Sequence, residues 1–381
     1  MIHTRTPPDA VPCRGWWGRT WRRLRAAHRA SRGFSLTELV VTMVLSTVIA
    51  IGAFHIHATF QASLHRQDEI TRIQGTMKIA RAMLERKIRP AGAGMVGVVS
   101  SDCGGTHQVG PFTFHNSNVI GTNDTTLGGT DNDPDWFEVM SADMTNSGYL
   151  TGQSPIRGIT KPVDDPTKFK VGGLIGLRNG NGICVFMISK IMPSAGRIQY
   201  SPGHGGSLGA LQSCYNQIAD RKDCEENVMM DKFLEAGDQI IDLSTGSFAL
   251  RIDDTQPARP VLMMATGVAG GDPTLYQWKP VAVNVEDMQI ALHLDTSDPP
   301  DGMGEIWVNS RDLTVAELMN VRAVRINLVF RSNNEVVGWR AGRRPELEDR
   351  PAATVTDGYI RRVMTTVIKL RNRPEPRPAS P

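Results

Sequence analysis

The sequence predicts an α+β fold in which one long N-terminal α-helix packs on a large, antiparallel, β-rich head. Three observations support this prediction. Residues 39–54 form an uncharged apolar run, residues 60–88 carry apolar side chains at helical spacing, and strand-like segments occupy most of the remainder. With 381 residues and 40% hydrophobic side chains, the chain is long enough for a large core in one domain or two.

The first half of the predicted helix is apolar on every side. No charge interrupts the run from Leu39 to Phe54, and Phe34, Leu36 and Ile56 lengthen the apolar segment. About 20 apolar residues make roughly 30 Å of helix, which is enough to span a lipid bilayer.

The second half of the predicted helix is apolar on one side only. Charged residues alternate there with an apolar stripe spaced by three, four or their sums, made of Phe60, Leu64, Ile73, Met77, Ala80, Leu84 and Ile88. The helix is expected to end at Arg89, because Pro90 and the glycines after it cannot continue it. Ser35 to Arg89 is therefore predicted to be one helix of roughly 80 Å.

Residues 90–372 are predicted to form the β-rich head. Short apolar runs alternate with clusters of Gly, Asn, Asp and Pro, and the predicted strands are Trp136–Met140, Gly173–Arg178, Ile183–Ile188, Gln239–Leu243, Phe248–Ile252, Val261–Ala265, Val281–Leu294, Val321–Arg331 and Arg361–Leu370. The second and third of these are joined by Asn-Gly-Asn-Gly at 179–182, which predicts a hairpin. The Pro-rich tail, 373–381, is predicted to be disordered.

Charge is distributed unevenly along the chain. The formal net charge is +3, but residues 1–33 hold eight Arg and one acid, Asp9. A basic segment ahead of an apolar helix is typical of a cytoplasmic flank. The remainder, with 34 basic and 38 acidic residues, is mildly acidic, which argues against nucleic acid as the main partner.

The cysteines suggest an oxidised, exported head. Cys13 lies in the basic segment, and the body contains Cys103, Cys184, Cys214 and Cys224. Four cysteines allow three disulfide connectivities or free thiols, and we favour Cys214–Cys224 with Cys103–Cys184. A zinc site is not expected, because no C-x-x-C spacing occurs. No metal or cofactor is predicted.

The junction between the basic and apolar segments carries a processing motif, Arg-Gly-Phe-Ser-Leu-Thr-Glu-Leu at 32–39. An ordinary signal peptide is cut after its apolar region, whereas here the small residue Gly33 precedes it. This stretch resembles the signal of type IV prepilins and type II secretion pseudopilins. The resemblance implies that a prepilin peptidase removes the leader 1–33, cleaving between Gly33 and Phe34, and N-methylates Phe34. Helix 34–89 would remain on the product.

Glu38 is the one ionisable residue at the start of the apolar helix. A carboxylate at the start of a membrane helix is costly and is functional by default. The family resemblance implies that Glu38 pairs with the positive N-terminal amine of Phe34 of a neighbouring subunit. Because an unpaired buried charge costs about 3–5 kcal/mol, such a pair would fix the register of assembly. The alternative is a carboxylate solvated by lipid headgroups.

The body of the chain resembles PilW-type minor pilins in several segments, namely 80–97, 171–189, 281–295, 321–332 and 361–373. Two features depart from the wider family. The leader is long, so translation could start after Met1. Many major pilins have a proline about where His55 stands, and its absence favours a continuous helix and a minor role.

The resemblance implies a minor pilin that primes or caps a type IV pilus. It would be a single-pass inner-membrane protein with its head in the periplasm, later displayed on the pilus. Implied partners are the prepilin peptidase, other minor pilins, the major pilin and the inner-membrane assembly platform.

Other functions remain open at this stage. The first is a minor pseudopilin of a type II secretion system, and the second is a tip adhesin or DNA-uptake module. A membrane-tethered enzyme is a third, but no G-x-S-x-G, H-E-x-x-H or Walker pattern occurs and no catalytic residue is predicted.

Overall fold

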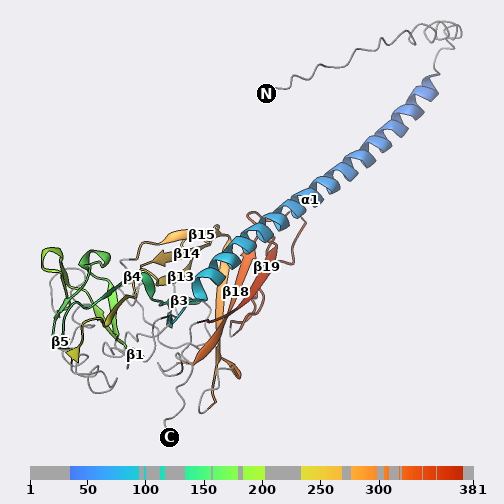
Figure 1. Cartoon of the computed structure of the whole chain (residues 1–381). Coiled ribbons are helices and arrows are strands. Elements are labelled where there is room, and N and C mark those ends of the chain that lie inside the picture. The colour runs from blue at the N-terminus through green and yellow to red at the C-terminus, as the bar shows by residue number, and fades with distance from the viewer. Residues whose placement is uncertain are drawn as a thin grey trace, which may run out of the picture. The chain divides into compact units, whose positions relative to one another are not determined.

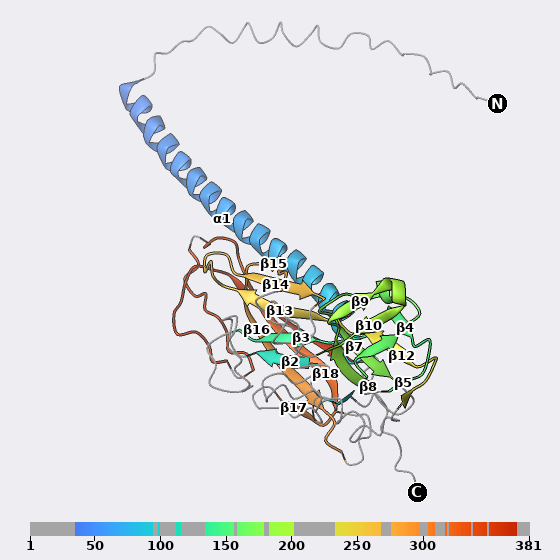
Figure 2. The same cartoon turned by 90° about the vertical axis from the view of Figure 1, so that its left-hand side faces the viewer.

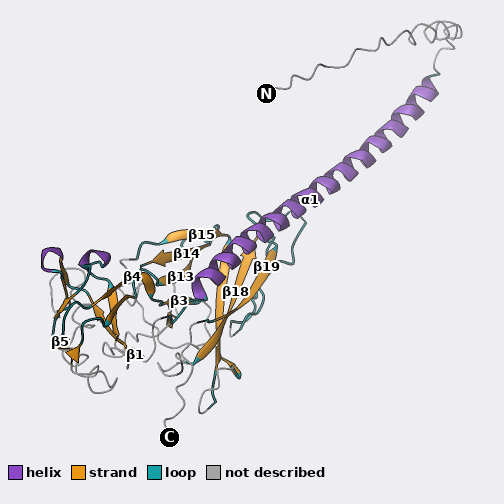
Figure 3. Ribbon diagram, viewed as in Figure 1, coloured by secondary structure: helices purple, strands orange, loops and turns teal. Residues whose placement is uncertain are grey.

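The computed structural model describes residues 35–93, 98–99, 112–115, 134–155, 158–178, 183–201, 233–267, 276–297, 304–308, 317, 320–336, 338–348 and 350–371. Within these ranges one long helix, α1 (Leu36–Ile88), precedes a region built mainly of strands (Figures 1 and 3). The chain divides into two compact units, Met1–Ser63 and Leu64–Pro381, so the boundary falls within α1. The predicted α+β class is confirmed.

Helix α1 has the predicted extent to within one residue at each end. Its first turn begins with the backbone N–H groups of Glu38 and Leu39 donating to the Ser35 carbonyl at 3.0 and 3.1 Å. At its end, the residue before a proline is disfavoured in the helical conformation. After Pro90 the chain turns through Gly92, whose φ of 73° suits a residue without a Cβ.

Two sheets of the Leu64–Pro381 unit pack around the second half of α1. The first has strand order β15-β14-β13-β3-β2, with β2 (Phe112–His115), β3 (Trp136–Val139), β13 (Phe248–Asp253), β14 (Val261–Thr266) and β15 (Lys279–Val283). The second has order β17-β16-β18-β19, with β16 (Val285–Leu294), β17 (Ile306–Val308), β18 (Val321–Arg331) and β19 (Arg361–Lys369). All strand pairs in these two sheets are antiparallel.

One continuous core joins these sheets to the helix. Side chains from all three pack together, including Ile73, Leu84, Ile88, Phe137, Phe248, Leu250, Ile290, Ile326 and Phe330. A fully buried side chain of this size stabilises the fold by about 1.5–3 kcal/mol. From Ile73 onward the predicted stripe is buried, except that Met77 is partly buried, whereas Phe60 and Leu64 are 59% and 42% exposed.

The described residues between 140 and 247 form a separate layer, and we call this part of the chain the inserted module. Its main sheet has order β1-β8-β7-β12-β4, with β1 (Val98–Val99), β4 (Asp143–Tyr149), β7 (Leu174–Arg178), β8 (Ile183–Met187) and β12 (Gln239–Asp242). Smaller elements complete it: β5 (Ser154–Pro155), β6 (Thr160–Pro162), β9 (Lys190–Met192), β10 (Arg197–Gln199), β11 (Phe233–Leu234), η1 (Pro166–Lys168) and η2 (Pro193–Ala195). β1, which precedes the module in the chain, pairs with β8 in parallel and is an exception to the antiparallel prediction.

The inserted module has its own cores. Its buried clusters draw only on residues between Met140 and Leu243, whereas the core around α1 draws on none of them. The chain leaves the first sheet after Val139, forms the module, and returns to the sheet at Phe248. Val139 and Phe248 are cross-strand partners. In Figure 2 the module, mainly in green, lies to one side of the two sheets that contact the helix.

The segment 333–360 crosses the second sheet and is attached to it by buried ion pairs. The fully buried carboxylate of Asp287 on β16 contacts Arg344 at 3.1 Å and Arg350 at 2.5 Å. Glu348 accepts hydrogen bonds from Arg325 and from Asn327 on β18, at 2.7 and 2.6 Å. Each charge in these contacts therefore has a partner.

Most predicted strands are confirmed, with one correction. Val281–Leu294 was expected to be a single strand, but Asn284 adopts a left-handed φ of 59° and separates β15 from β16. The break is needed because the two strands belong to different sheets, and Asn tolerates this conformation better than most residues. The hairpin β7–β8 is confirmed by its register, although its turn, 179–182, lies outside the described residues.

Candidate assembly helix and adjoining cleft

The part of α1 from Leu36 to Ser63, which we call the apolar segment, presents its side chains outward all round. Among them, Ile49 and Phe54 are 70% and 75% exposed. Of the described helices, α1 is the one long and apolar enough to cross a membrane, and none of its most apolar window is buried. So large a continuous apolar surface requires lipid or other protein to cover it.

Four hydroxyl side chains of the apolar segment, those of Thr42, Ser46, Thr47 and Thr59, donate to the helix backbone. Thr42 donates to the carbonyls of Glu38 and Leu39, each at 2.9 Å. Thr47 and Ser46 both donate to the Met43 carbonyl, at 2.7 and 3.0 Å. An unsatisfied polar group is expensive in hydrocarbon, so these internal bonds fit the segment for an apolar environment.

Glu38 lies in the first turn of α1 and is exposed. A negative charge is favourable at a helix N-terminus because it complements the helix dipole. Within the described residues Glu38 forms no ion pair, and the next basic side chain along the helix is His55, about 25 Å away at helical rise. A cation that pairs with Glu38 must therefore come from the residues before Ser35 or from another molecule.

The remaining predicted site residues lie mainly outside the described part of the chain. Gly33 and Phe34 are among them, so cleavage and methylation stay predictions. Cys184 is fully buried on β8 and is disulfide-bonded. Cys103, Cys214 and Cys224 lie outside the described residues, so the pairing stays a prediction.

Polar contacts fix the start of the second half of α1 to the head. Glu69 accepts a hydrogen bond from the backbone N–H of Asn333 at 3.0 Å. The guanidinium of Arg66 lies 5.7 Å from the ring centre of Trp339, within the range of a cation–π contact. The sequence pattern treated both helix residues only as polar spacers, because neither periodicity nor charge shows which loop a helix face meets.

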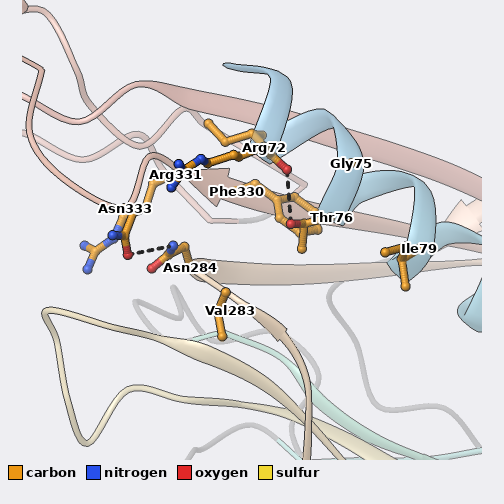
Figure 4. Close-up of a pocket in the computed structure, with 10 residues that line it drawn as sticks. Arg72, Gly75, Thr76, Ile79, Val283, Asn284, Phe330, Arg331 and Asn333 are labelled. Atoms are coloured by element: carbon orange, nitrogen blue, oxygen red, sulfur yellow. Dashed lines mark hydrogen bonds between the residues drawn. The ribbon is translucent and has the colours of Figure 1, made fainter. Parts of the chain in front are cut away.

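A cleft of about 530 Å³ lies between α1 and the ends of β15 and β18 (Figure 4). Its lining comprises Arg72, Ile73, Gly75, Thr76, Ile79, Val283, Asn284, Phe330, Arg331 and Asn333. Asn284 donates to Asn333 across its floor at 3.4 Å. The lining contains apolar surface, amides and two guanidinium groups, but no carboxylate, imidazole or thiol, so it offers contact surface and no acid–base pair.

Comparison with known families adds two matches. Residues 248–372 match the family described as Type IV Pilus-assembly protein W, and residues 28–54 match the prokaryotic N-terminal methylation motif. The first match covers β13 to β19, and the second covers Gly33, Phe34 and Glu38. Searches of curated proteins and of solved structures found no match.

The helix, the β-rich head and the methylation motif are together the features expected of a type IV pilin-like protein. Within that class, the match over residues 248–372 is to the pilus-assembly family PilW. The resemblance to PilW-type minor pilins expected from the sequence is therefore confirmed. The family matched over residues 248–372 is described as a pilus-assembly protein.

Proposed function

We propose that this protein is a minor pilin that primes or caps a type IV pilus. A prepilin peptidase would cleave between Gly33 and Phe34 and N-methylate Phe34. The mature chain would span the inner membrane once with its head in the periplasm. Through α1 it would then join other minor pilins and the major pilin at the inner-membrane assembly platform.

The observation that carries this proposal is the position of Glu38. It is the one ionisable residue in the exposed, otherwise uncharged surface between Leu36 and Phe54. In an apolar environment a carboxylate is much more stable when it is paired with a cation. No described basic side chain of its own helix reaches Glu38. The N-terminal amine of an adjacent Phe34 would supply that cation, which would set the axial register between subunits.

The size of the head supports a low-copy position. The inserted module, 140–247, lies outside both family matches and adds a folded layer to the β13–β19 scaffold. A subunit of the repeating shaft must pack neighbours on several sides, so extra bulk is better tolerated at a tip.

The test is the mass of the N-terminal peptide from the mature protein, purified from cells that assemble pili. We expect a peptide that starts at N-methylated Phe34. An intact leader, or a start beyond Phe54, would contradict the proposal. A Gly33→Val variant serves as a control, since a branched side chain at the cleavage position should leave the leader in place.

A second candidate function is recognition of a surface or of DNA by the inserted module at the pilus tip. The observation that favours it is that the module has its own core and lies outside the PilW match. Normal pilus number with lost attachment in a strain lacking this protein would make recognition the primary role. The alternative function, a minor pseudopilin of a type II secretion system, is less favoured than a minor pilin, because the match over residues 248–372 is to a pilus-assembly family.

A further inference from the structure

Strand β19 (Arg361–Lys369) is the last strand of its sheet. The strand order is β17-β16-β18-β19, and β19 pairs with β18 along its whole length without a register shift (Figure 1). Its other edge has no strand beside it within the described residues. An edge of this kind presents a row of backbone donors and acceptors that can pair with a further strand.

Hydrogen bonds at the two ends of β19 show which residues face that open edge. The backbone N–H of Ser332 donates to the Ile360 carbonyl at 2.8 Å, and the backbone N–H of Leu370 donates to the Arg322 carbonyl at 3.0 Å. In an antiparallel pair alternate residues bond to the same neighbour, so even-numbered residues of β19 bond to β18. The backbone groups of Val363, Thr365 and Val367 therefore point away from it.

The residue beyond the strand confirms this direction. The backbone N–H of Arg371, also odd-numbered, donates away from β18 to the Arg89 carbonyl at the end of α1, at 3.2 Å. Between Arg361 and Lys369 the described structure contains no hydrogen bond to an outward-facing backbone group.

The exposed side chains of β19 are those of a strand that can accept a partner. Val363 and Val367 are 37% and 50% exposed, and Thr365 lies exposed between them. Met364 and Ile368 point the other way, into the core. The strand has neither a proline nor a bulge, which are common devices that protect an edge from pairing.

Charge limits which strand can pair there. Arg362 and Lys369 are exposed, and β19 contains no acid. A second copy of β19 would bring only further basic residues to the pair, because the strand carries Arg361, Arg362 and Lys369 and no acid. Like charges directly opposite one another destabilise a strand pair, so self-pairing is disfavoured. The chain's own tail does not suit the edge either, because Pro374, Pro376 and Pro378 lack backbone donors.

We propose that the open edge of β19 accepts a strand from a different polypeptide, rich in β-branched residues and acidic at its ends. Backbone hydrogen bonds would supply affinity, and the acids would pair with Arg362 and Lys369. This inference rests on the proposed function for its setting, where the donor is a neighbouring pilin-like subunit. It deepens that function, because it adds a contact made by the head to those made by α1.

A peptide-binding experiment on the full chain in detergent tests the proposal. The probe is the eight-residue peptide Glu-Val-Thr-Val-Thr-Val-Thr-Glu, whose terminal acids lie opposite Lys369 and Arg362 in an antiparallel pair, and the control peptide carries Lys at both ends. We expect the acidic peptide to bind at least about tenfold more tightly than the control. Hydrogen exchange at single-residue resolution should show fast amides at Val363, Thr365 and Val367 that become protected when it binds.

Variants identify the edge. Thr365→Pro removes an outward backbone donor and leaves the backbone bonds to β18 in place, but it also removes the hydrogen bond from the Thr365 hydroxyl to Asn327 at 2.7 Å. It should weaken peptide binding at least about tenfold, whereas Thr365→Val, which lacks the same hydroxyl but keeps the backbone donor, should not. If Thr365→Pro fails to fold, the Arg362→Glu/Lys369→Glu double variant replaces it and should prefer the Lys-ended peptide. Slow exchange at the odd-numbered amides of the free chain, or binding that neither variant alters, would overturn the proposal.

The outcome is separable from that of the proposed function. A chain that is correctly processed and incorporated into pili but shows no binding at β19 would remove strand addition alone. A chain whose mature N-terminus is not Phe34 would remove the filament setting, whatever β19 binds.

Discussion

Val139 and Phe248 are direct cross-strand partners, although the whole inserted module separates them in the chain. Phe137 and Leu250 continue the same register, so the first sheet closes as if the module were a long turn. Near the junction, the Ser141 hydroxyl donates to the Gly246 carbonyl at 2.8 Å. A Cβ on Gly246 would lie 2.2 Å from the Ser141 carbonyl oxygen, so the two segments that connect the sheet to the module meet closely at this point.

Replacing residues 140–247 with Asn-Gly should leave the core around α1 folded. A two-residue turn suits two strands whose last residues are directly opposite. The measurement is thermal unfolding of the full chain in detergent, together with pilus number and attachment in cells. We expect one cooperative transition and normal pilus number, with attachment lost if the module is the recognition element.

Loss of the cooperative transition in the shortened chain would contradict the expectation that the core around α1 folds without the module. It would mean that β13 and β3 need the module to pair. Gly246→Ala in the intact chain provides the comparison, since its clash disturbs the junction without removing the module.

Glu38→Gln should leave membrane insertion and leader removal intact but reduce incorporation into pili. Glutamine has nearly the same shape and no charge, so it removes attraction to an N-terminal amine and little else. We expect at least about a tenfold loss of incorporation, since losing one partner of a buried ion pair is strongly unfavourable. Incorporation is measured by quantifying the protein in sheared pili.

Asp68→Asn is the matched control for Glu38→Gln. Asp68 is an acid of the same helix whose side chain is 58% exposed and pairs with Arg72 at 3.0 Å. An exposed ion pair contributes little, so incorporation should be unchanged. Equal incorporation of the Glu38→Gln variant and the control would refute the pairing role.

Asp287→Asn should destabilise the head strongly. The change would leave the guanidinium groups of Arg344 and Arg350 without their anion while their side chains are only 13% and 12% exposed. Breaking a buried ion pair in this way costs about 3–5 kcal/mol. Urea unfolding measures the loss, and a change below about 1 kcal/mol, as for an exposed ion pair, would show that the cluster is solvated.

Asp357→Asn should destabilise the protein at neutral pH and much less in acid. Side-chain hydrogen bonds from Arg361, at 2.6 Å to both carboxylate oxygens, hold the pKa of Asp357 below its ordinary value. A lowered carboxyl pKa contributes stability above the unfolded value of about 3.9, and that contribution disappears as pH falls through the folded value. The measurement is the urea midpoint of both proteins between about pH 7 and pH 3, where a constant difference would contradict the expectation.

The helix and most of the strands around it could be predicted from the sequence. Apolar periodicity predicted α1 because one side of it packs on the head from Ile73 to Ile88, and long apolar runs predicted β16 and β18 because both strands are mostly buried. The apolar stripe does not indicate burial at Phe60 and Leu64, which are exposed. Periodicity shows that a residue is apolar, but it does not show what covers the side chain.

Other features left no such trace. β4 has the sequence Asp-Met-Thr-Asn-Ser-Gly-Tyr and was not predicted, because its residues resemble a turn and its place comes from pairing with β12. The contact between Arg66 and Trp339 was missed for the same reason, since tertiary structure alone brings the two together. Glu38 could be identified from the sequence alone, because a single acid within an apolar run is recognisable without knowledge of the fold.

A bundle of helices like α1 would have little to stop one helix from sliding along another. The hydroxyls of Thr42, Ser46 and Thr47 bond to their own backbone, so smooth aliphatic surface is what each helix offers its neighbours. Hydrogen bonds between helices usually help hold membrane helices together. Here these hydroxyl donors already bond to carbonyls of their own helix. Under tension, such a bundle would lengthen by slippage until the single charged contact near its end gives way.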